Sequence, residues 1–89
     1  MINVEENKTT YMVNDVVMGE VDYPYINKDT VNITHTFVDN SLRGQGIADK
    51  LMTEVFKYLS ENNLKVVCTC SYAVSWLEKH PEYQNLKVD

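Results

Sequence analysis

No apolar run in this 89-residue sequence approaches the roughly 20 residues that a membrane-spanning helix requires. The first residues also lack the basic segment and the apolar segment that together form a secretory signal peptide. We therefore expect a cytoplasmic protein with no membrane partner. An excess of basic residues is absent as well, because the formal net charge is −5. Nucleic acid is accordingly not an expected partner, since its binding usually rests on a basic surface.

Cysteine is scarce, and the two cysteines that are present, Cys68 and Cys70, lie within a predicted strand. Residues two apart in a strand point the same way, which places these thiols poorly for a mutual disulfide. We therefore predict free thiols. Together with His35 and His80 they could supply four zinc ligands, but a Cys-x-Cys spacing without a paired knuckle is not that of a structural zinc site. We expect no metal.

Low-complexity stretches, internal repeats and linkers are also missing. The composition, 44% hydrophobic and 24% charged, is that of a soluble folded domain. A chain of this length is enough for one domain and not for two. The sequence therefore predicts a single domain over residues 1–89, which we expect to be monomeric.

Alternation of apolar and polar residues predicts four strands in the first half of the chain. They are expected at residues 2–6, 9–13, 16–23 and 30–38. Asn14-Asp15 and Asn27-Lys28-Asp29 are turn signals between them, so the strands should form an antiparallel meander. In the last strand, the alternation predicts one face that carries Val31, Ile33, His35 and Phe37.

A helix is predicted to begin near Gly46, because apolar residues then recur at every fourth position up to a stop signal at Asn62-Asn63. A fifth strand is predicted at residues 65–70 and a second helix at residues 71–80, with Ser71 as its N-cap. Pro81 can open a further short turn. A strand, a helix and a strand in this order imply a parallel pair. The expected fold class is thus α+β: a four-strand antiparallel meander, a helix, a fifth strand parallel to the fourth, and a C-terminal helix.

The segment Arg43-Gly44-Gln45-Gly46-Ile47-Ala48 follows a predicted strand and opens a predicted helix. The first N–H groups of a helix have no internal partner, and the helix dipole adds partial positive charge, so an anion can bind there. The glycines would let a pyrophosphate approach the backbone, and the arginine could add charge. A flexible loop before an ordinary helix start is the alternative. The patterns G-x-x-x-x-G-K-S/T and the three-glycine dinucleotide fingerprint are both absent.

Arg43-x-x-Gly46-x-Ala48 resembles the motif Q/R-x-x-G-x-G/A of the GNAT N-acetyltransferase superfamily, and it stands at the family's place before the long helix. Three further runs are similar to those of a subgroup of very small GNAT-like proteins: His35-Thr36-Phe37-Val38, Cys70-Ser71-Tyr72 and His80-Pro81-Glu82-Tyr83. The resemblance covers nearly the whole chain. It implies a minimal GNAT-like fold and an enzyme that moves an acetyl group from acetyl-coenzyme A (acetyl-CoA) to an unidentified amine.

The resemblance also implies which residues would hold the cofactor. In that family the pyrophosphate lies on the motif, the pantetheine arm adds to the fourth strand, and the acetyl group lies in the gap between the fourth and fifth strands. The expected cofactor-binding residues are Phe37, Val38, Arg43, Gly44, Gln45, Gly46, Ile47, Ala48 and Tyr72. The chain departs from typical members because it lacks the helices after the first strand and the sheet after the last helix, which normally help to shape the acceptor site.

Two residues, His35 and Cys70, are candidates for the chemical step. An imidazole near its normal pKa can accept a proton from an amine, although a core histidine is the alternative for His35. A helix N-terminus lowers the pKa of a thiol, although Cys70 could be a small core residue. Four functions stay open: direct transfer to an amine, transfer through Cys70, a coenzyme A (CoA)-binding module with little or no transferase activity, and an interaction domain without cofactor.

Overall fold

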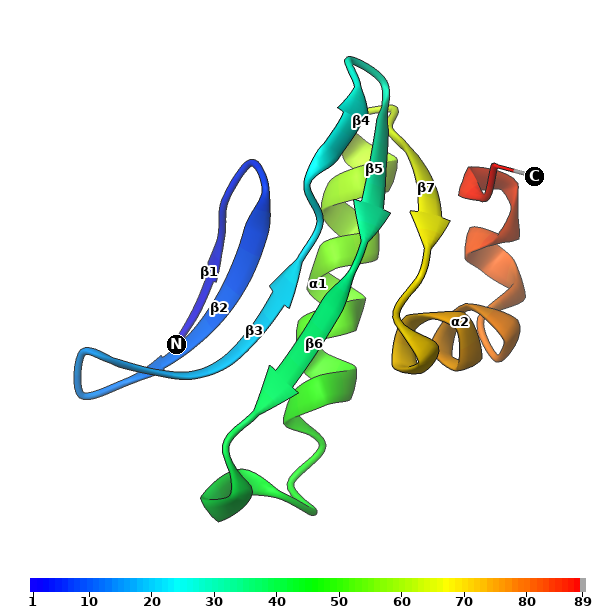
Figure 1. The fold of residues 1–89 in the computed structure, drawn as a ribbon. Helices are drawn as coiled ribbons and strands as arrows, with labels where there is room; N and C mark the ends of the chain where they lie inside the picture. Colours follow the sequence, from blue (N-terminus) through cyan, green and yellow to red (C-terminus); the bar gives the residue numbers. More distant parts are fainter. Residues whose placement is uncertain (89) are drawn as a thin grey trace.

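Two turn residues with left-handed backbone shape the first part of the fold. In the computed structural model, which describes residues 1–88, Asn14 and Asp15 have φ angles of 49° and 65°. Asn and Asp tolerate this conformation, and two such residues in a row form the tight turn that suits a β-hairpin. The turn joins β2 (Lys8–Val13) to β3 (Val16–Asp22), and β1 (Ile2–Val4) pairs with β2. The predicted hairpin is confirmed (Figure 1).

The predicted fourth strand is interrupted at Thr34 and forms two strands, β5 (Thr30–Ile33) and β6 (His35–Val38). β6 pairs with β3 and completes an antiparallel sheet of order β1-β2-β3-β6. β5 joins a second sheet of order β4-β5-β7, which contains β4 (Tyr25–Asn27) and the parallel strand β7 (Lys65–Cys68). The α+β prediction, with an antiparallel meander and a parallel last strand, is confirmed. The prediction of one continuous strand over residues 30–38 is wrong.

The interruption at Thr34 reverses which side chains point inward. Val31 and Ile33 are fully buried, but His35 and Phe37, predicted on the same face, are exposed. The N–H of Thr34 donates to the carbonyl of Asp22 in β3 (3.0 Å). The carbonyl of Ile33 instead accepts hydrogen bonds from residues just after β7. One residue that does not continue the pleat moves every later side chain to the opposite face. The expectation of His35 within an apolar strand face is therefore wrong.

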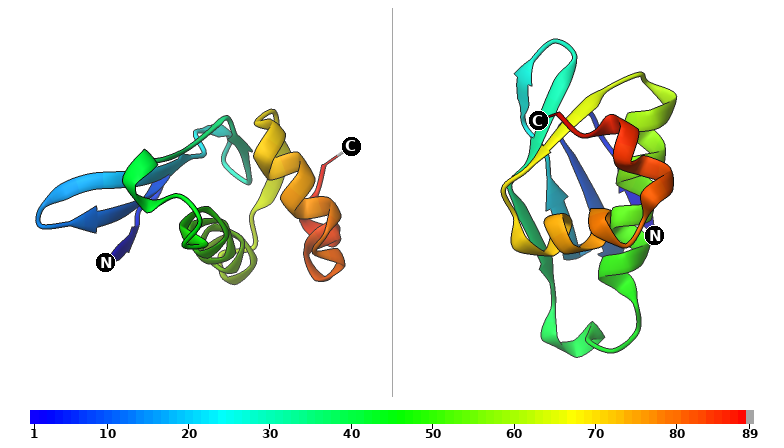
Figure 2. Two further views of the ribbon diagram at one scale, coloured as in Figure 1. Left: turned by 90° about the horizontal axis from the view of Figure 1, so that it is seen from below. Right: turned by 90° about the vertical axis from the view of Figure 1, so that its right-hand side faces the viewer.

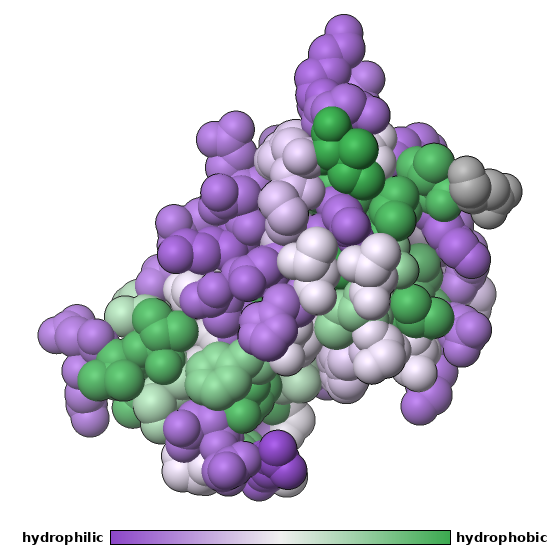
Figure 3. Space-filling view, viewed as in Figure 1, coloured by the Kyte–Doolittle hydropathy of each residue, from purple (hydrophilic) through white to green (hydrophobic). Residues whose placement is uncertain are grey.

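α1 (Ile47–Glu61) packs against the first sheet because one side of it is apolar along its whole length. Its buried residues are Ile47, Leu51, Met52, Val55, Phe56 and Leu59. The helix begins directly after Gly46 and ends before Asn63, whose φ of 56° fits the predicted stop. Figure 2 shows α1 on one face of the first sheet and, among residues 1–88, no helix on the other. Figure 3, which looks onto that open face, shows polar side chains over its middle and apolar ones over the β2–β3 hairpin.

The start of α2 (Ser71–Glu78) differs from the prediction, because Cys70 and not Ser71 is its N-cap residue. β7 ends at Cys68, and the N–H groups of Thr69 and Cys70 both donate to the carbonyl of Ile33, each at 3.1 Å. Cys70 therefore lies outside the strand, and the prediction that both thiols share one strand face is wrong. η2 (Pro81–Leu86) follows α2 as the predicted short turn. Neither helix of the described residues has the length and apolar character needed to cross a membrane.

Candidate functional site

Two glycines with left-handed backbone shape the loop between η1 (Asn40–Leu42) and α1. Gly44 and Gly46 have φ angles of 84° and 73°, a region that L side chains rarely adopt. A Cβ atom at either position would meet no atom within 4 Å, so the space beside the loop is open. The loop therefore leaves its backbone accessible to a ligand on this side.

The start of α1 places unpaired N–H groups next to these glycines. The first hydrogen bond of the helix runs from the N–H of Lys50 to the carbonyl of Gly46 (3.1 Å). The N–H groups of Ile47, Ala48 and Asp49 come before it and have no partner within the helix. No side chain of the described residues caps this end. Unpaired amides and the helix dipole together favour an anion at this place.

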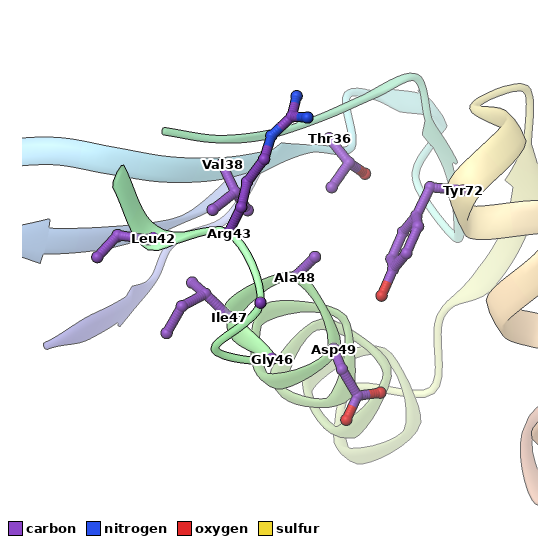
Figure 4. Close-up of a pocket in the computed structure, with 10 residues that line it drawn as sticks. Thr36, Val38, Leu42, Arg43, Gly46, Ile47, Ala48, Asp49 and Tyr72 are labelled. Carbon is purple, nitrogen blue, oxygen red and sulfur yellow. The ribbon is translucent and has the colours of Figure 1, made fainter. Parts of the chain in front are cut away.

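A cavity of about 460 Å³ lies beside the loop, between β6, the first turn of α1 and α2 (Figure 4). Its volume is in the range of small-molecule sites. In Figure 4, Ala48 points from α1 toward β6, and the Tyr72 ring points from α2 toward Asp49. The cavity thus has one end at the amides of the loop and another end at Thr36 and Tyr72. Its full lining is Thr36, Val38, Leu42, Arg43, Gly44, Gly46, Ile47, Ala48, Asp49 and Tyr72.

β6 is an edge strand of its sheet, so half of its backbone groups are directed away from β3. The N–H of Asp39 donates to the carbonyl of Met18 in the β3–β6 register (2.7 Å), and the direction of these bonds alternates along an antiparallel strand. Phe37 therefore turns its N–H and C=O toward β3, whereas Thr36 and Val38 turn theirs toward the cavity. An extended ligand chain could add along this free edge.

Most of the residues predicted to hold a cofactor lie around this one cavity. Phe37 and Gln45 do not line it, and the Phe37 side chain is 42% exposed on the open face of the sheet. The structure adds Thr36, Leu42 and Asp49 to the lining. Alternation through an unbroken strand does not single out Thr36, whereas the first-turn position of Asp49 is a usable signal in the sequence. The predicted residues that do line the cavity are Val38, Arg43, Gly44, Gly46, Ile47, Ala48 and Tyr72.

Cys70 does not line the cavity itself but contacts Thr36, which does, at the point where the end of β7 meets the start of α2. Its Sγ is 3.4 Å from Oγ1 of Thr36, and the N–H groups of Ala73 and Tyr72 face the sulfur without forming a regular capping bond. Burial by itself raises the pKa of this thiol, but the Thr36 hydroxyl and the backbone N–H groups of Thr36, Tyr72 and Ala73 stabilise the thiolate and outweigh burial, so the pKa lies below its usual value. Cys68 and Cys70 are both free, and the described residues contain no cluster of three metal-ligating side chains.

His35 lies on the other side of the sheet from the cavity. It is exposed, it stands opposite Asp22 of β3, and Glu20 lies on the same face. A hydrogen bond between the carboxyl groups of Glu20 and Asp22 raises the pKa of Glu20 above its usual range. The structure thus separates the two candidate residues for the chemical step, with Cys70 against Thr36 on the cavity side of the sheet and His35 on the open face.

Proteins of known sequence or known structure are similar to this chain. Protein NATD1 of Xenopus tropicalis is 35% identical over 65 residues, which are 73% of this chain and 60% of that protein. The chain therefore spans only about three-fifths of that relative's length. The solution structure of a GCN5-like candidate N-acetyltransferase from Staphylococcus aureus superposes with a TM-score of 0.78 at 35% identity, covering 99% of this chain and 87% of that one.

A more distant structure shares the fold. The crystal structure of a GNAT family acetyltransferase from Elizabethkingia anophelis with acetyl-CoA bound has a TM-score of 0.62 at 19% identity, covering 85% of this chain and 51% of that one. The model of the family GCN5-related N-acetyl-transferase matches residues 9–86, which is nearly the whole chain and includes every residue that lines the cavity. The chain belongs to the GCN5-related N-acetyltransferase family.

Proposed function

We propose that the chain binds acetyl-CoA and transfers its acetyl group to an amine. The observation that carries this proposal is the single cavity that joins the unpaired amides at the start of α1 to the free edge of β6. Acetyl-CoA has a matching layout, because an anionic pyrophosphate and a thioester stand at opposite ends of an extended arm that contains amides. The Elizabethkingia acetyltransferase, whose fold this chain shares, was solved with acetyl-CoA bound, which supports the assignment.

In this proposal the pyrophosphate is bound by backbone N–H groups of Gly44, Gly46 and the first turn of α1. Arg43 lines the cavity beside them and adds a charge-assisted hydrogen bond. The formal net charge of the chain is −5, so its overall field repels an anion. The local group of donors must therefore supply the attraction. The open space beside both glycines is the room that the phosphate oxygens need.

The arm of the ligand then pairs with backbone groups that Val38 and Thr36 direct away from β3, and the thioester lies at the Thr36 end of the cavity. A backbone N–H of this edge polarises the thioester carbonyl. The neutral amine attacks the carbonyl carbon, a C–N bond forms, and the C–S bond breaks. The CoA thiolate leaves, and the proton of the amine passes to a base or to water.

The base is His35 or water, and the open face on which His35 lies is the side from which an acceptor can approach without crossing α1. Cys70 offers a second route, in which its thiolate attacks the thioester and carries the acetyl group until an amine displaces it. The lowered pKa of Cys70 favours this role, because the thiolate is the nucleophile. Both routes have the same overall chemistry, but only the second passes through a covalent acetyl-Cys70 intermediate.

Titration calorimetry with CoA tests the binding site. Gly46→Asp and Gly46→Asn have nearly the same shape, Asn tolerates the left-handed backbone, and a Cβ has room at this position. We expect the aspartate to weaken CoA binding at least about tenfold more than the asparagine, because only the aspartate puts a negative charge beside the pyrophosphate. Equal affinities for the two variants would remove the loop from the phosphate site.

A turnover assay then separates an enzyme from a binding module. Acetyl-CoA is incubated with the protein and a panel of amines, and the release of free CoA thiol is followed. Release that depends on one amine supports transfer, and mass spectrometry of that amine should find one added acetyl group. Tight CoA binding with no amine-dependent release above the rate of the Gly46→Asp variant would instead identify a CoA-binding module.

A further inference from the structure

Beyond the Thr36 end of the cavity, the chain passes from β7 to α2 through Thr69 and Cys70. We call the junction of these two residues with Ile33 the seam. The carbonyl of Ile33 accepts hydrogen bonds from the N–H groups of both Thr69 and Cys70, each at 3.1 Å. Beside it, the Thr69 hydroxyl donates to Oδ1 of Asn32 (3.0 Å). The gap between β6 and α2 is therefore closed by backbone within one residue of the point where the parallel β5–β7 pairing stops.

Two side chains meet at this end: Thr36, which lines the cavity, and Cys70, which lies behind Thr36 and contacts it. Sγ of Cys70 lies 3.4 Å from Oγ1 of Thr36, so the two side chains bridge the gap. Both residues are partly buried, and Cys70 packs against the hydrophobic core. A group that extends from the cavity toward the seam meets this bridge first, and the hydrogen-bonded backbone lies directly behind it.

We propose that the Thr36–Cys70 bridge limits the acyl group of the thioester to a short chain, so that Thr36 and Cys70 are specificity-determining residues. The inference rests on the proposed function, because it takes the thioester to lie at the Thr36 end of the cavity. An acetyl group reaches the bridge and stops there. A butyryl group has two more methylenes, and these can be accommodated only by separating Sγ of Cys70 from Thr36 or by bending the chain out of the gap.

Either response weakens binding. Separating the bridge moves side chains that the core and the seam hold in place, and forcing extra methylenes into packed space is destabilising. Bending the chain outward exposes its methylenes to water, so they add no hydrophobic stabilisation to the complex. The bridge thus selects acetyl-CoA over longer acyl-CoA thioesters through space alone, and CoA without an acyl group should bind about as well as acetyl-CoA.

Calorimetric titration with CoA, acetyl-CoA and butyryl-CoA tests the inference. For the unmodified protein we expect similar Kd values for CoA and acetyl-CoA and a Kd for butyryl-CoA that is about tenfold higher or more. Cys70→Ala and Thr36→Ala each remove atoms of the bridge, so each should lower the ratio of the butyryl to the acetyl Kd. Thr36→Val keeps the size of the side chain and removes only the hydroxyl, so its ratio should stay high. Cys68→Ala is the control for loss of a thiol elsewhere.

The possible failures are distinguishable. Normal CoA binding with equal Kd values for acetyl-CoA and butyryl-CoA would overturn the inference and leave the proposed function standing. An unchanged ratio in both alanine variants, each shown by circular dichroism to be folded and by titration to bind CoA, would do the same. Failure of the unmodified protein to bind CoA would overturn the proposed function and the inference with it.

Discussion

The thiols of Cys70 and Cys68 are two positions apart in the chain but have opposite environments. Burial raises the pKa of Cys68 to about 11, and the neighbouring Cys70 adds to the shift. Cys70 stands outside the strand at the start of α2, where Thr36 and backbone N–H groups stabilise its thiolate and lower its pKa. Because the thiolate is the reactive form, these pKa shifts predict that Cys70 is the more reactive of the two thiols.

Brief alkylation with limiting iodoacetamide near pH 8 should therefore modify Cys70 before Cys68. We expect an excess of roughly tenfold or more, because a far smaller fraction of Cys68 is thiolate at that pH. The labelling rate of Cys70 should also level off at a lower pH than that of an ordinary cysteine. Peptide mass mapping measures both sites, and bound CoA should protect Cys70. Equal labelling in urea, where both thiols are exposed, is the control, and equal labelling of the folded protein would contradict the assignment.

At the scale of elements, one polar contact fixes α2 to α1 beside the cavity. Nε1 of Trp76 donates to Oδ1 of Asp49 (2.7 Å), and the Trp76 side chain is only 5% exposed. The same indole stacks on His80, with ring centroids 3.5 Å apart, and on Phe56, at 4.9 Å. Asp49 and Tyr72 line the cavity from the two helices, so this contact helps to set the width of the site.

Two substitutions at Asp49 separate this structural role from the charge of the carboxylate. Asp49→Ala leaves the buried indole N–H without its partner and should lower the free energy of unfolding by about 1–3 kcal/mol. Asp49→Asn keeps an acceptor oxygen and should cost less. Because both remove a negative charge from the wall of an anion site, CoA should bind the asparagine variant more tightly than the unmodified protein. Urea unfolding and calorimetry measure the two effects, and equal stability of both variants would show that the hydrogen bond contributes nothing.

The elements that the sequence predicts well are those whose signal is local. The four-residue spacing in α1, its stop at Asn63, and the turn at Asn14 and Asp15 all depend on neighbouring residues, and the structure has them where expected. The glycine loop is equally local, which is why the sequence predicts most of the residues around it. The break at Thr34 is different, because it results from the competition of two sheets for adjacent backbone groups.

The consequences of that break explain the errors at the site. Alternation counted through Thr34 put His35 inward and Thr36 outward, and the structure has the reverse. The predicted extent of the last strand is wrong for a related reason. The carbonyl of Ile33 accepts the N–H groups of Thr69 and Cys70, so β7 ends early, and the N-cap of the helix is Cys70, one residue before the predicted cap Ser71. Both features depend on contacts between segments far apart in the chain, which no local pattern encodes.

At the scale of the whole molecule, folding raises the pKa of a partly buried thiol, Cys68, and of a fully buried phenol, Tyr23. Burial raises the pKa of Cys68 from 9.0 to about 11 and that of Tyr23 from 10.0 to about 12. Tyr23 is fully buried, its hydroxyl donates to the carbonyl of Glu5 (2.7 Å), and it lies 2.8 Å from Oγ1 of Thr9. For a group whose pKa is raised by folding, the stabilisation is complete below the unfolded pKa and is lost as pH rises through the folded pKa.

The free energy of unfolding should therefore fall between about pH 9 and pH 12, by up to about 1.4 kcal/mol per pH unit for each group. Urea unfolding followed by the fluorescence of the single tryptophan, Trp76, measures this in the presence of a reductant. Cys68→Ala should reduce the decline in the free energy of unfolding between about pH 9 and 11, and Tyr23→Phe should reduce the decline above about pH 10. Tyr23→Phe also removes the hydrogen bonds of the hydroxyl, so it lowers stability at about pH 7. If the decline comes only from the growing net negative charge, both variants should lose stability as steeply as the unmodified protein. A shallower slope in each variant, confined to its own pH range, assigns the loss to these two groups.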